Sequence, residues 1–149
     1  LLLFHRELSA FCDEVLVSTD DGSFGMKGIV TDPLRDRLEN DRTIAEVVAV
    51  GPVPMMQAVA NLTREYGVRT TVSLNSLMVD GMGMCGACRV TVGGETKFTC
   101  VDGPEFDGHQ VDFAELRSRL STFNAQEKQS LDDYREHPCR CFEQAGSPA

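Results

Sequence analysis

Three of the six cysteines fall within residues 79–100, and their spacing constrains the fold more than any other feature of the chain. Cys85 and Cys88 are separated by two residues, and Cys100 follows after eleven more. Asp80 precedes Cys85 with four residues between them, which gives the pattern D-x4-C-x2-C-x11-C. Plant-type ferredoxins hold a two-iron two-sulfur cluster with a C-x4-C-x2-C spacing and a fourth cysteine further on. The pattern therefore predicts such a cluster, with Asp80 in the place of the first cysteine.

The residues after Cys88 predict a hairpin that brings two of the cysteines together. Residues 89–92 and 95–99 favour β-structure and are joined by two glycines, which is typical of a two-residue hairpin turn. This pairing sets Cys88 opposite Thr99 and returns Cys100 beside Cys88. Adjacent strands lie roughly 5 Å apart, so both thiolates can bind one small cluster.

Other interpretations of the same loop differ in strength. Gly81, Gly83 and Gly86 match G-x-G-x-x-G, but a dinucleotide-binding fingerprint should open a helix, and a predicted strand follows here. A thioredoxin-like C-x-x-C fails for the same reason. A zinc ribbon stays open as an alternative, because three thiolates and one carboxylate can form a tetrahedral site. A disulfide or unreactive thiols are the remaining possibilities.

Composition limits the classes of partner. The 149 residues carry a net charge of −9 with a pI of about 4.7, which argues against binding to nucleic acid or to anionic membranes. No apolar run approaches the ~20 residues that span a bilayer. Free cysteines in a metal-type spacing favour a reducing compartment. We therefore expect a cytoplasmic protein without nucleic-acid or membrane partners.

The first half of the chain alternates predicted helices and strands. Helices are expected at residues 1–11, from Asp32-Pro33 onward and after Pro54, and strands at residues 14–19, 46–50 and 68–74. This alternation indicates an α/β fold with a parallel sheet and right-handed crossovers. After Cys100, a turn-rich stretch leads to two predicted helices, the first capped by Asp112.

Ligands of parallel sheets bind beyond the carboxyl ends of the strands. This rule predicts a nucleotide site at Asp20, Asp21, Gly51 and Pro52, with the helix after Pro54 directing its N–H groups at a bound anion. A carboxylate accepts from a ribose 2′-hydroxyl and repels a 2′-phosphate, which favours NAD(H) over NADP(H). Ordinary turn formation is the alternative role for all four residues.

Three remaining groups of side chains are not assigned to a site. His109 could be a metal ligand, but a surface or capping role is expected because Asp80 already completes a set of four. Cys12 is expected to be a buried, unreactive thiol. Cys139 and Cys141 are expected to be structural or solvent-exposed thiols.

Three segments carry a resemblance to a known family: VGPVPMM, NSLMVDGMGMCGACRVTVGGETKFTCVDGPEFDGH and AQEKQSLDDYREH. They resemble the C-terminal part of the small subunit of NADH-dependent reduced ferredoxin:NADP oxidoreductase, also called sulfide dehydrogenase. The resemblance implies a two-iron two-sulfur cluster held by Asp80, Cys85, Cys88 and Cys100. The related electron-transfer subunit of dihydroorotate dehydrogenase has a cysteine where this chain has Asp80.

The resemblance also implies an organisation for the chain. Residues 1–74 would be the C-terminal part of an NAD(P)-binding domain of the ferredoxin-reductase type, residues 75–110 the cluster subdomain, residues 111–138 two C-terminal helices and residues 139–149 a tail. An FAD-binding barrel and the first strands of the nucleotide domain would precede Leu1 in a longer protein. We therefore expect a partial sheet with an exposed edge.

The implied function is that of an enzyme subunit that transfers electrons. NADH bound near Gly51 would reduce FAD in the preceding part, and the cluster would pass single electrons to a larger flavin and iron–sulfur subunit. Ferredoxin would be reached indirectly, in electron bifurcation between NADH, NADPH and ferredoxin. No residue is assigned to acid–base chemistry. The alternatives are a dihydroorotate dehydrogenase electron-transfer subunit and a non-enzymatic zinc-ribbon interaction module.

Overall fold

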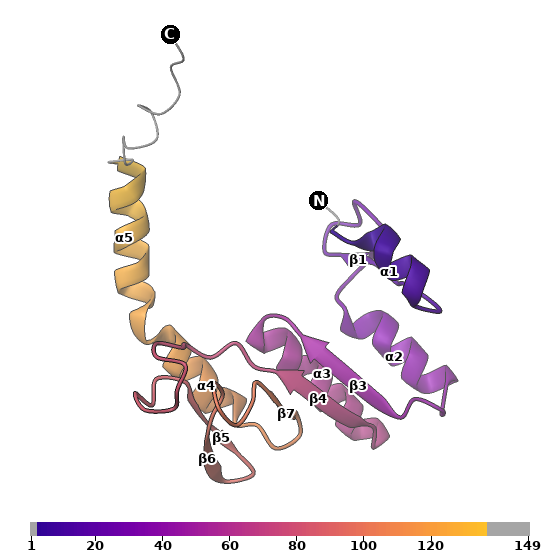
Figure 1. Ribbon diagram of the computed structural model, residues 1–149. Helices are drawn as coiled ribbons and strands as arrows, with labels where there is room; N and C mark the ends of the chain where they lie inside the picture. Colours follow the sequence, from indigo (N-terminus) through magenta and orange to yellow (C-terminus); the bar gives the residue numbers. More distant parts are fainter. Residues whose placement is uncertain (1–2, 137–149) are drawn as a thin grey trace.

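The computed structural model of the protein describes residues 3–136 (Figure 1). Its first elements are α1 (His5–Phe11), β1 (Ser18–Thr19), β2 (Met26–Lys27), α2 (Thr31–Asn40), β3 (Glu46–Val50), α3 (Val53–Tyr66) and β4 (Arg69–Ser73). They are followed by β5 (Arg89–Val92), β6 (Glu95–Phe98), β7 (Glu105–Asp107), α4 (Phe113–Leu120), the 3-10 helix η1 (Ser121–Phe123) and α5 (Asn124–Glu136). The predicted tail, with Cys139 and Cys141, lies outside the described residues.

The central sheet has the order β3-β4-β7. β3 and β4 are parallel and in full register, with Glu46 opposite Arg69 at one end and Val50 opposite Ser73 at the other. α3 connects these two strands, as the strand–helix alternation predicts. β7 adds antiparallel to the other side of β4. The fold is therefore the expected α/β type, with a parallel pair extended by one strand from the cysteine-containing half.

The first predicted strand is shorter than expected and belongs to a different sheet. Only Ser18 and Thr19 form β1, which pairs with β2 in a separate two-stranded sheet. A strand exists only where its backbone groups find a partner. Within residues 3–136, β2 is the single strand paired with β1, and it is short because glycines at 25 and 28 with positive φ bound it. The prediction of a strand over residues 14–19 was therefore wrong in length.

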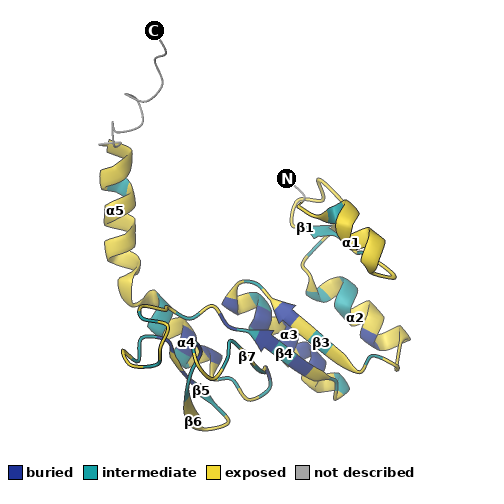
Figure 2. Ribbon diagram, in the orientation of Figure 1, coloured by how far each residue is buried: buried dark blue, intermediate teal, exposed yellow. Residues whose placement is uncertain are grey.

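One hydrophobic core joins the sheet to the cysteine-containing half (Figure 2). Met56 of α3 and Val72 of β4 are fully buried on one side of it. Val90 of β5 and Leu116 of α4 are equally buried on the other. Because α4 packs against both α3 and β5, it fixes the β5–β6 hairpin relative to the sheet. The hairpin is thus held by tertiary packing and not only by its own turn.

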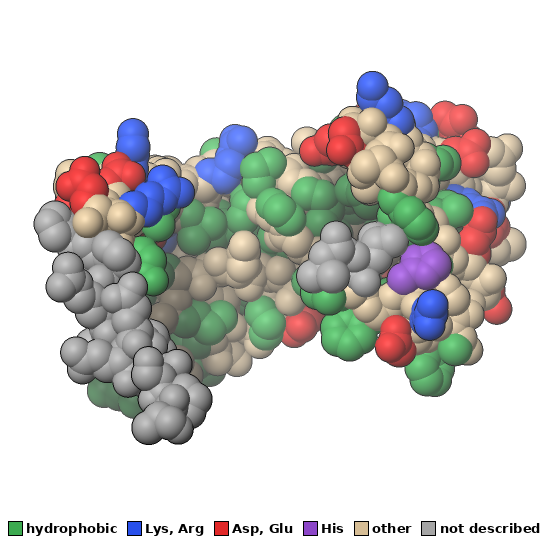
Figure 3. All heavy atoms as spheres, turned by 90° about the horizontal axis from the view of Figure 1, so that it is seen from above, with side chains coloured by type: hydrophobic (Ala, Val, Ile, Leu, Met, Phe, Trp, Pro, Cys, Tyr) green, Lys and Arg blue, Asp and Glu red, His purple; other side chains and the backbone are tan. Residues whose placement is uncertain are grey.

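The peripheral helices contribute little to this core. α1 and α5 contain no buried residue among those described, and α5 extends away from the rest of the molecule (Figure 1). The expectation of a buried thiol at Cys12 was wrong, because this residue follows the exposed helix α1 and is itself exposed. Seen from above, exposed hydrophobic side chains gather along the middle of the molecule (Figure 3). Within residues 3–136 there is no helix with the length and apolar character needed to cross a bilayer.

Candidate iron–sulfur site

The β5–β6 hairpin brings Cys88 and Cys100 together as the sequence predicts. Val92 pairs with Glu95 across the turn, which sets the register of the two strands. At the open end, the backbone N–H of Thr99 donates to the carbonyl of Cys88 at 3.2 Å, and its hydroxyl donates to the same oxygen at 3.1 Å. The next residue, Cys100, places its Sγ 3.2 Å from the Sγ of Cys88. The hairpin therefore presents two sulfurs side by side.

The two thiols differ in burial and in proton affinity. Cys88 is only 1% exposed, whereas Cys100 is half-buried. Burial raises the pKa of the Cys88 thiol, but hydrogen bonds from the backbone and thiol of Cys100 and from Thr99 lower it below its ordinary value. The hydrogen bond to Cys88, burial and the charges of Cys88 and Asp80 raise the pKa of Cys100. Cys88 and Cys100 thus form a pair in sulfur–sulfur contact, of which Cys88 is the buried member.

Asp80 organises the loop that precedes Cys85. One of its oxygens, Oδ1, accepts from the backbone N–H of Met82 at 2.9 Å, and Oδ2 accepts from the N–H of Cys85 at 2.7 Å. These bonds, the one from Met82 foremost, hold the pKa of Asp80 below its ordinary value. The carboxylate is therefore ionised and lies directly beside the backbone of Cys85. An aspartate that folds back on its own loop in this way is a common turn device.

The loop that follows lies over the sulfur pair. Gly83 and Gly86 have positive φ, which allows the tight turns. The amide of Gly83 acts on Cys100 and partly counters the rise in its pKa. A side chain at position 83 would meet Val101 at 2.8 Å, so only glycine fits there without movement. The Sγ of Cys85 is exposed and accepts from the N–H of Ala87 at 3.5 Å.

The four predicted ligands are thus arranged as two pairs. Cys88 and Cys100 are in sulfur–sulfur contact, and Asp80 and Cys85 are linked through the carboxylate and the Cys85 amide. In the part of the chain that the structure describes, no three His, Cys, Asp or Glu side chains converge closely enough to hold a metal ion. The donor chemistry nevertheless fits an iron–sulfur group, because thiolate ligands and backbone N–H groups aimed at sulfur are what such clusters require.

His109 takes a structural position. Its Nε2 lies 3.1 Å from the hydroxyl of Thr63, which in turn contacts the hydroxyl of Thr70. Both threonines are fully buried, so the histidine ring completes a polar network between α3 and β4. The sequence analysis expected a surface or capping role for His109, whereas the residue is half-buried and its ring contacts Thr63. The signal for this role was the threonine pair, which no local pattern connects to residue 109.

A cleft of about 510 Å³ lies where the nucleotide site is predicted. Asp20 and Pro52 both line it, together with Ser18 and Met55. Its lining therefore combines the loop after β1 with residues at the start of α3. The cleft is largely apolar, with Asp20 as its one carboxylate among the lining residues.

The other two predicted nucleotide residues form turns. Asp21 Oδ1 accepts from the N–H of Ser23 at 2.9 Å, and this bond above all lowers the pKa of Asp21. Gly51 does not line the cleft; it lies in the turn between β3 and α3, where a Cβ atom would meet only the flexible end of the Met55 side chain. The structure thus brings Asp20 and Pro52 to the cleft, and it gives Asp21 and Gly51 roles in turns.

Comparison with known proteins places this geometry in a class. Residues 75–112 match the iron–sulfur cluster binding domain of dihydroorotate dehydrogenase B. The chain is 54% identical over 121 residues to a homologue of the dihydroorotate dehydrogenase B electron transfer subunit from Thermotoga maritima, covering 81% of this chain and 43% of the relative. It is 48% identical over 128 residues to an uncharacterised protein of Clostridium beijerinckii, covering 85% of this chain and 43% of the relative.

A solved structure gives the same result in three dimensions. A chain of the NADH-dependent reduced ferredoxin-NADP oxidoreductase structure, described in work on flavin-based electron bifurcation, is 50% identical with a TM-score of 0.76. The match covers 90% of this chain and 47% of that chain. The present chain therefore spans less than half the length of the relatives named here.

These matches define the chain as homologous to electron-transfer subunits of flavin- and iron–sulfur-dependent oxidoreductases. Within that class, the resemblance to the small subunit of NADH-dependent reduced ferredoxin:NADP oxidoreductase is confirmed.

Proposed function

We propose that this chain carries a two-iron two-sulfur cluster held by Asp80, Cys85, Cys88 and Cys100, within an electron-transfer subunit. The observation that carries the proposal is the Cys88–Cys100 sulfur pair, 3.2 Å apart at the end of a hairpin. The pair lies inside the segment that matches an iron–sulfur cluster binding domain. When bound, such a cluster supplies a carrier for one electron at a time.

In this proposal, two ligands of the cluster come from the β5–β6 hairpin and two from the preceding loop. Cys88, buried in the core, fixes the position of one thiolate, and Cys100 adds the second from the adjacent strand. Asp80 and Cys85 supply an oxygen and a sulfur from the loop that lies over them. The oxygen ligand is harder than a thiolate and alters the charge and hydrogen bonding that set the potential. No side chain here acts as a general acid or base in the proposal, since the cofactors carry the chemistry.

The remaining parts of the proposal concern the longer protein. The cleft at Asp20 and Pro52 would take part of an NAD(H) or NADP(H) molecule, next to an FAD bound outside this chain. The division into residues 1–74, 75–110, 111–138 and 139–149 belongs to this proposal. A larger flavin and iron–sulfur subunit would receive the electrons in the cytoplasm, with ferredoxin as an indirect partner in electron bifurcation. Exposed Met82 and Met84, 69% and 83% accessible on the loop, support contact with a partner there.

The deciding experiment is anaerobic purification of the full-length protein with its partner subunit. We expect two irons and two sulfides attributable to this segment, with a paramagnetic signal on reduction. A Cys88→Ser variant should lose them, and a Cys12→Ser variant should keep them, because Cys12 is exposed and outside the motif. One zinc and no sulfide in this segment would instead show the zinc-ribbon alternative and refute the proposal.

A second function is favoured by one observation. The family model matched by residues 75–112 is that of dihydroorotate dehydrogenase B, and several relatives carry that name. The two functions predict different partners and acceptors. Copurification with a dihydroorotate-oxidising subunit would establish the second, whereas NADP⁺-linked ferredoxin turnover by the purified complex would establish the first.

A further inference from the structure

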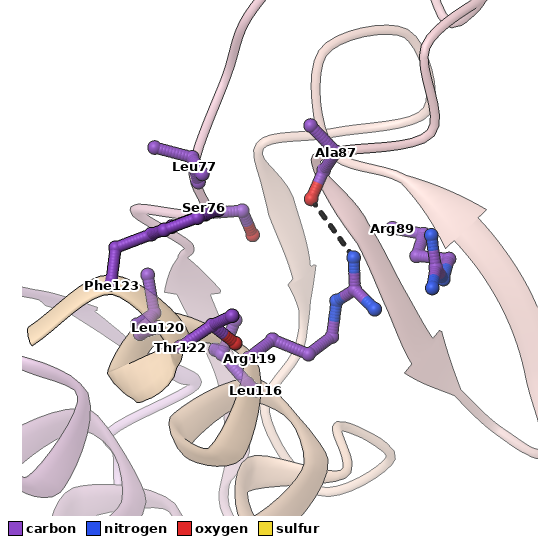
Figure 4. A pocket seen from close by; sticks show the side chains of 9 residues that line it. All are labelled: Ser76, Leu77, Ala87, Arg89, Leu116, Arg119, Leu120, Thr122 and Phe123. Atoms are coloured by element: carbon purple, nitrogen blue, oxygen red, sulfur yellow. Dashed lines mark hydrogen bonds between the residues drawn. The ribbon is translucent and has the colours of Figure 1, made fainter.

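The loop between Cys85 and Cys88 is held from outside by two arginines. Arg89 Nη1 donates to the carbonyl of Gly86 at 3.1 Å. Arg119, which comes from the last turn of α4, donates through Nη2 to the carbonyl of Ala87 at 3.1 Å and lies 3.5 Å from that of Gly86. Figure 4 shows the Arg119 side chain extending from α4 toward Ala87, with Arg89 beside the same loop.

The peptide group between Gly86 and Ala87 links these arginines to a proposed ligand. Its carbonyl oxygen faces the two guanidinium groups, while its N–H, that of Ala87, donates to the Sγ of Cys85 at 3.5 Å. The two ends of a trans peptide point in opposite directions, so one peptide dipole runs from the arginines to the sulfur. Withdrawal of electron density at the oxygen strengthens the N–H as a donor, because chained hydrogen bonds polarise one another.

The surroundings of Arg119 increase this effect. The side chain forms one wall of a cavity of about 400 Å³ whose other walls include Leu77, Leu116 and Leu120. Ser76 Oγ, also in this wall, is buried without a hydrogen-bond partner in the part of the chain described. Next to apolar side chains, a charge acts over a longer distance than in bulk water. No carboxylate of residues 3–136 lies within 4.0 Å of the Arg119 guanidinium to neutralise it.

We propose that Arg119 is a positioning residue that raises the reduction potential of the cluster at Cys85 and Cys88 through the Gly86–Ala87 peptide. Reduction by one electron, supplied by the reduced flavin of the longer protein, adds one negative charge to the cluster and breaks no bond. An N–H donor polarised by a guanidinium stabilises that added charge on the Cys85 sulfur. Arg119 therefore favours the reduced state without contacting iron or sulfur. This inference rests on the proposed function.

The test is a potentiometric titration of the full-length holoprotein, followed by electron paramagnetic resonance. Arg119→Gln should keep iron and sulfide but lower the midpoint potential. We expect the ratio of reduced to oxidised cluster, measured at the wild-type midpoint, to fall about tenfold, which corresponds to about 59 mV for one electron. Arg119→Lys keeps the charge but loses the planar fork of the guanidinium group. Its midpoint potential should therefore lie between that of the wild type and that of Arg119→Gln.

Arg117→Gln is the matched control. Arg117 lies on the same helix and is exposed, and its side chain makes no hydrogen bond within the described residues. The variant removes the same charge from α4, so its midpoint should move far less than that of Arg119→Gln. Equal shifts in the two variants, or no shift in either, would overturn the inference, because they would show that the peptide connection does not matter.

Two further outcomes of this test can be distinguished: loss of iron from the Arg119→Gln variant and absence of the cluster from the wild-type protein. If Arg119→Gln fails to retain iron, Arg89→Gln decides, since it removes the other guanidinium from the Gly86 carbonyl: a lowered midpoint supports the inference and an unchanged one overturns it. If the wild-type protein itself contains no iron and sulfide in this segment, the proposed function fails. Iron and sulfide present with an unchanged potential would refute the role of Arg119 alone.

Discussion

At the scale of single residues, Asp80 distinguishes this chain from a four-cysteine cluster protein. Its oxygens accept two backbone N–H groups of the following loop, so the carboxylate shapes the path of the chain to Cys85 as well as offering an oxygen donor. A cysteine at this position would restore the C-x4-C-x2-C spacing but could not accept both bonds. The aspartate therefore couples the structure of the loop to the proposed ligand set.

Replacing Asp80 by Cys tests that coupling. We expect Asp80→Cys to retain two irons, because the spacing is that of plant-type ferredoxins. The g-values and the midpoint potential should change, since a thiolate replaces an oxygen ligand. Electron paramagnetic resonance of the reduced holoprotein measures both the presence of the cluster and the change. Asp13→Cys, at an exposed position outside the loop, is the control and should leave the spectrum as in the wild type; a spectrum unaltered by Asp80→Cys would mean that Asp80 is not a ligand.

Asp20 and Asp21 provide a second pair of residues with different roles. Asp20 lines the cleft, whereas Asp21 is engaged with Ser23 in a turn. We expect Asp20→Ser to weaken the preference for NADH over NADPH by about tenfold in the ratio of kcat/KM values, because the carboxylate no longer repels a 2′-phosphate. Asp21→Ser should leave the ratio unchanged. Steady-state kinetics of the full-length complex with both nucleotides gives the answer, and an equal effect of the two variants would exclude Asp20 from the nucleotide site.

At the scale of elements, α4 determines how firmly the hairpin is attached. Asp112 caps this helix by accepting from the N–H of Glu115 at 2.9 Å. The helix then buries Phe113 and Leu116 against the core that includes Val90 of β5. The position of the sulfur pair thus depends on a helix that begins more than ten residues after Cys100 in the sequence.

Removing the cap should loosen the hairpin. We expect Asp112→Ala to lower the free energy of unfolding by about 1 kcal/mol, the usual cost of losing an N-cap side chain. Denaturant unfolding of the metal-free protein measures the change. Ser130→Ala in the exposed helix α5 should change it by less than about 0.5 kcal/mol. Equal effects of the two substitutions would show that the cap of α4 does not support the fold.

The turn after β7 should make stability depend on pH. Partial desolvation raises the pKa of Asp107, but hydrogen bonds from Gln110 and His109 and the nearby positive charges lower it below its ordinary value of 3.8. A carboxyl group whose pKa is lower in the folded state contributes stability above its unfolded pKa. That contribution is lost as the pH falls through the folded pKa.

The corresponding measurement compares Asp107→Asn with the wild type across pH. The difference in unfolding free energy should be constant above about pH 5, shrink below about pH 4 and vanish once the wild-type carboxyl group is protonated. Asp13→Asn, at an exposed aspartate without a side-chain hydrogen bond in the described part of the chain, is the control for the substitution itself. A difference for Asp107→Asn that grows toward low pH would contradict the assignment.

Local signals in the sequence predicted the elements that depend on neighbours in the chain. The glycine pair fixed the register of β5 and β6, and Asp112 marked the start of α4, because turn and cap chemistry act within a few residues. β7 was missed, since three residues carry too little pattern to indicate a strand. It forms because Phe106 can pair with Val72, which lies more than thirty residues earlier. The Thr63–His109 contact was missed for the same reason.

The candidate site could be predicted by residue type but not by arrangement. Spacing alone brought Cys88 and Cys100 together, because a hairpin has few possible registers. The path of the loop over them depends on Asp80 binding its own backbone, and on Arg119 reaching Ala87 from a distant helix. Such contacts depend on tertiary packing, and the spacing of residues in the sequence does not predict them.

At the scale of the whole molecule, one core supports two candidate sites. β3 leads at its carboxyl end into the cleft at Pro52, and β4 leads into the segment that contains the cysteines. α3 and α4 bury the faces of these elements in a single hydrophobic cluster. The sulfur pair and the cleft are therefore parts of one packed unit, although they occupy different halves of the sequence.

The pairing of β3 with β4, which sets Val50 opposite Ser73, has a consequence for the spacing of the two candidate sites. The cleft at Pro52 and the segment that leads to the cysteines both start from the ends of these neighbouring strands. A slip of one residue would displace one strand end by about 3.3 Å and invert its buried face, which the core does not allow. The backbone hydrogen bonds between the two strands therefore keep the cleft and the start of the cysteine-containing segment at a fixed separation.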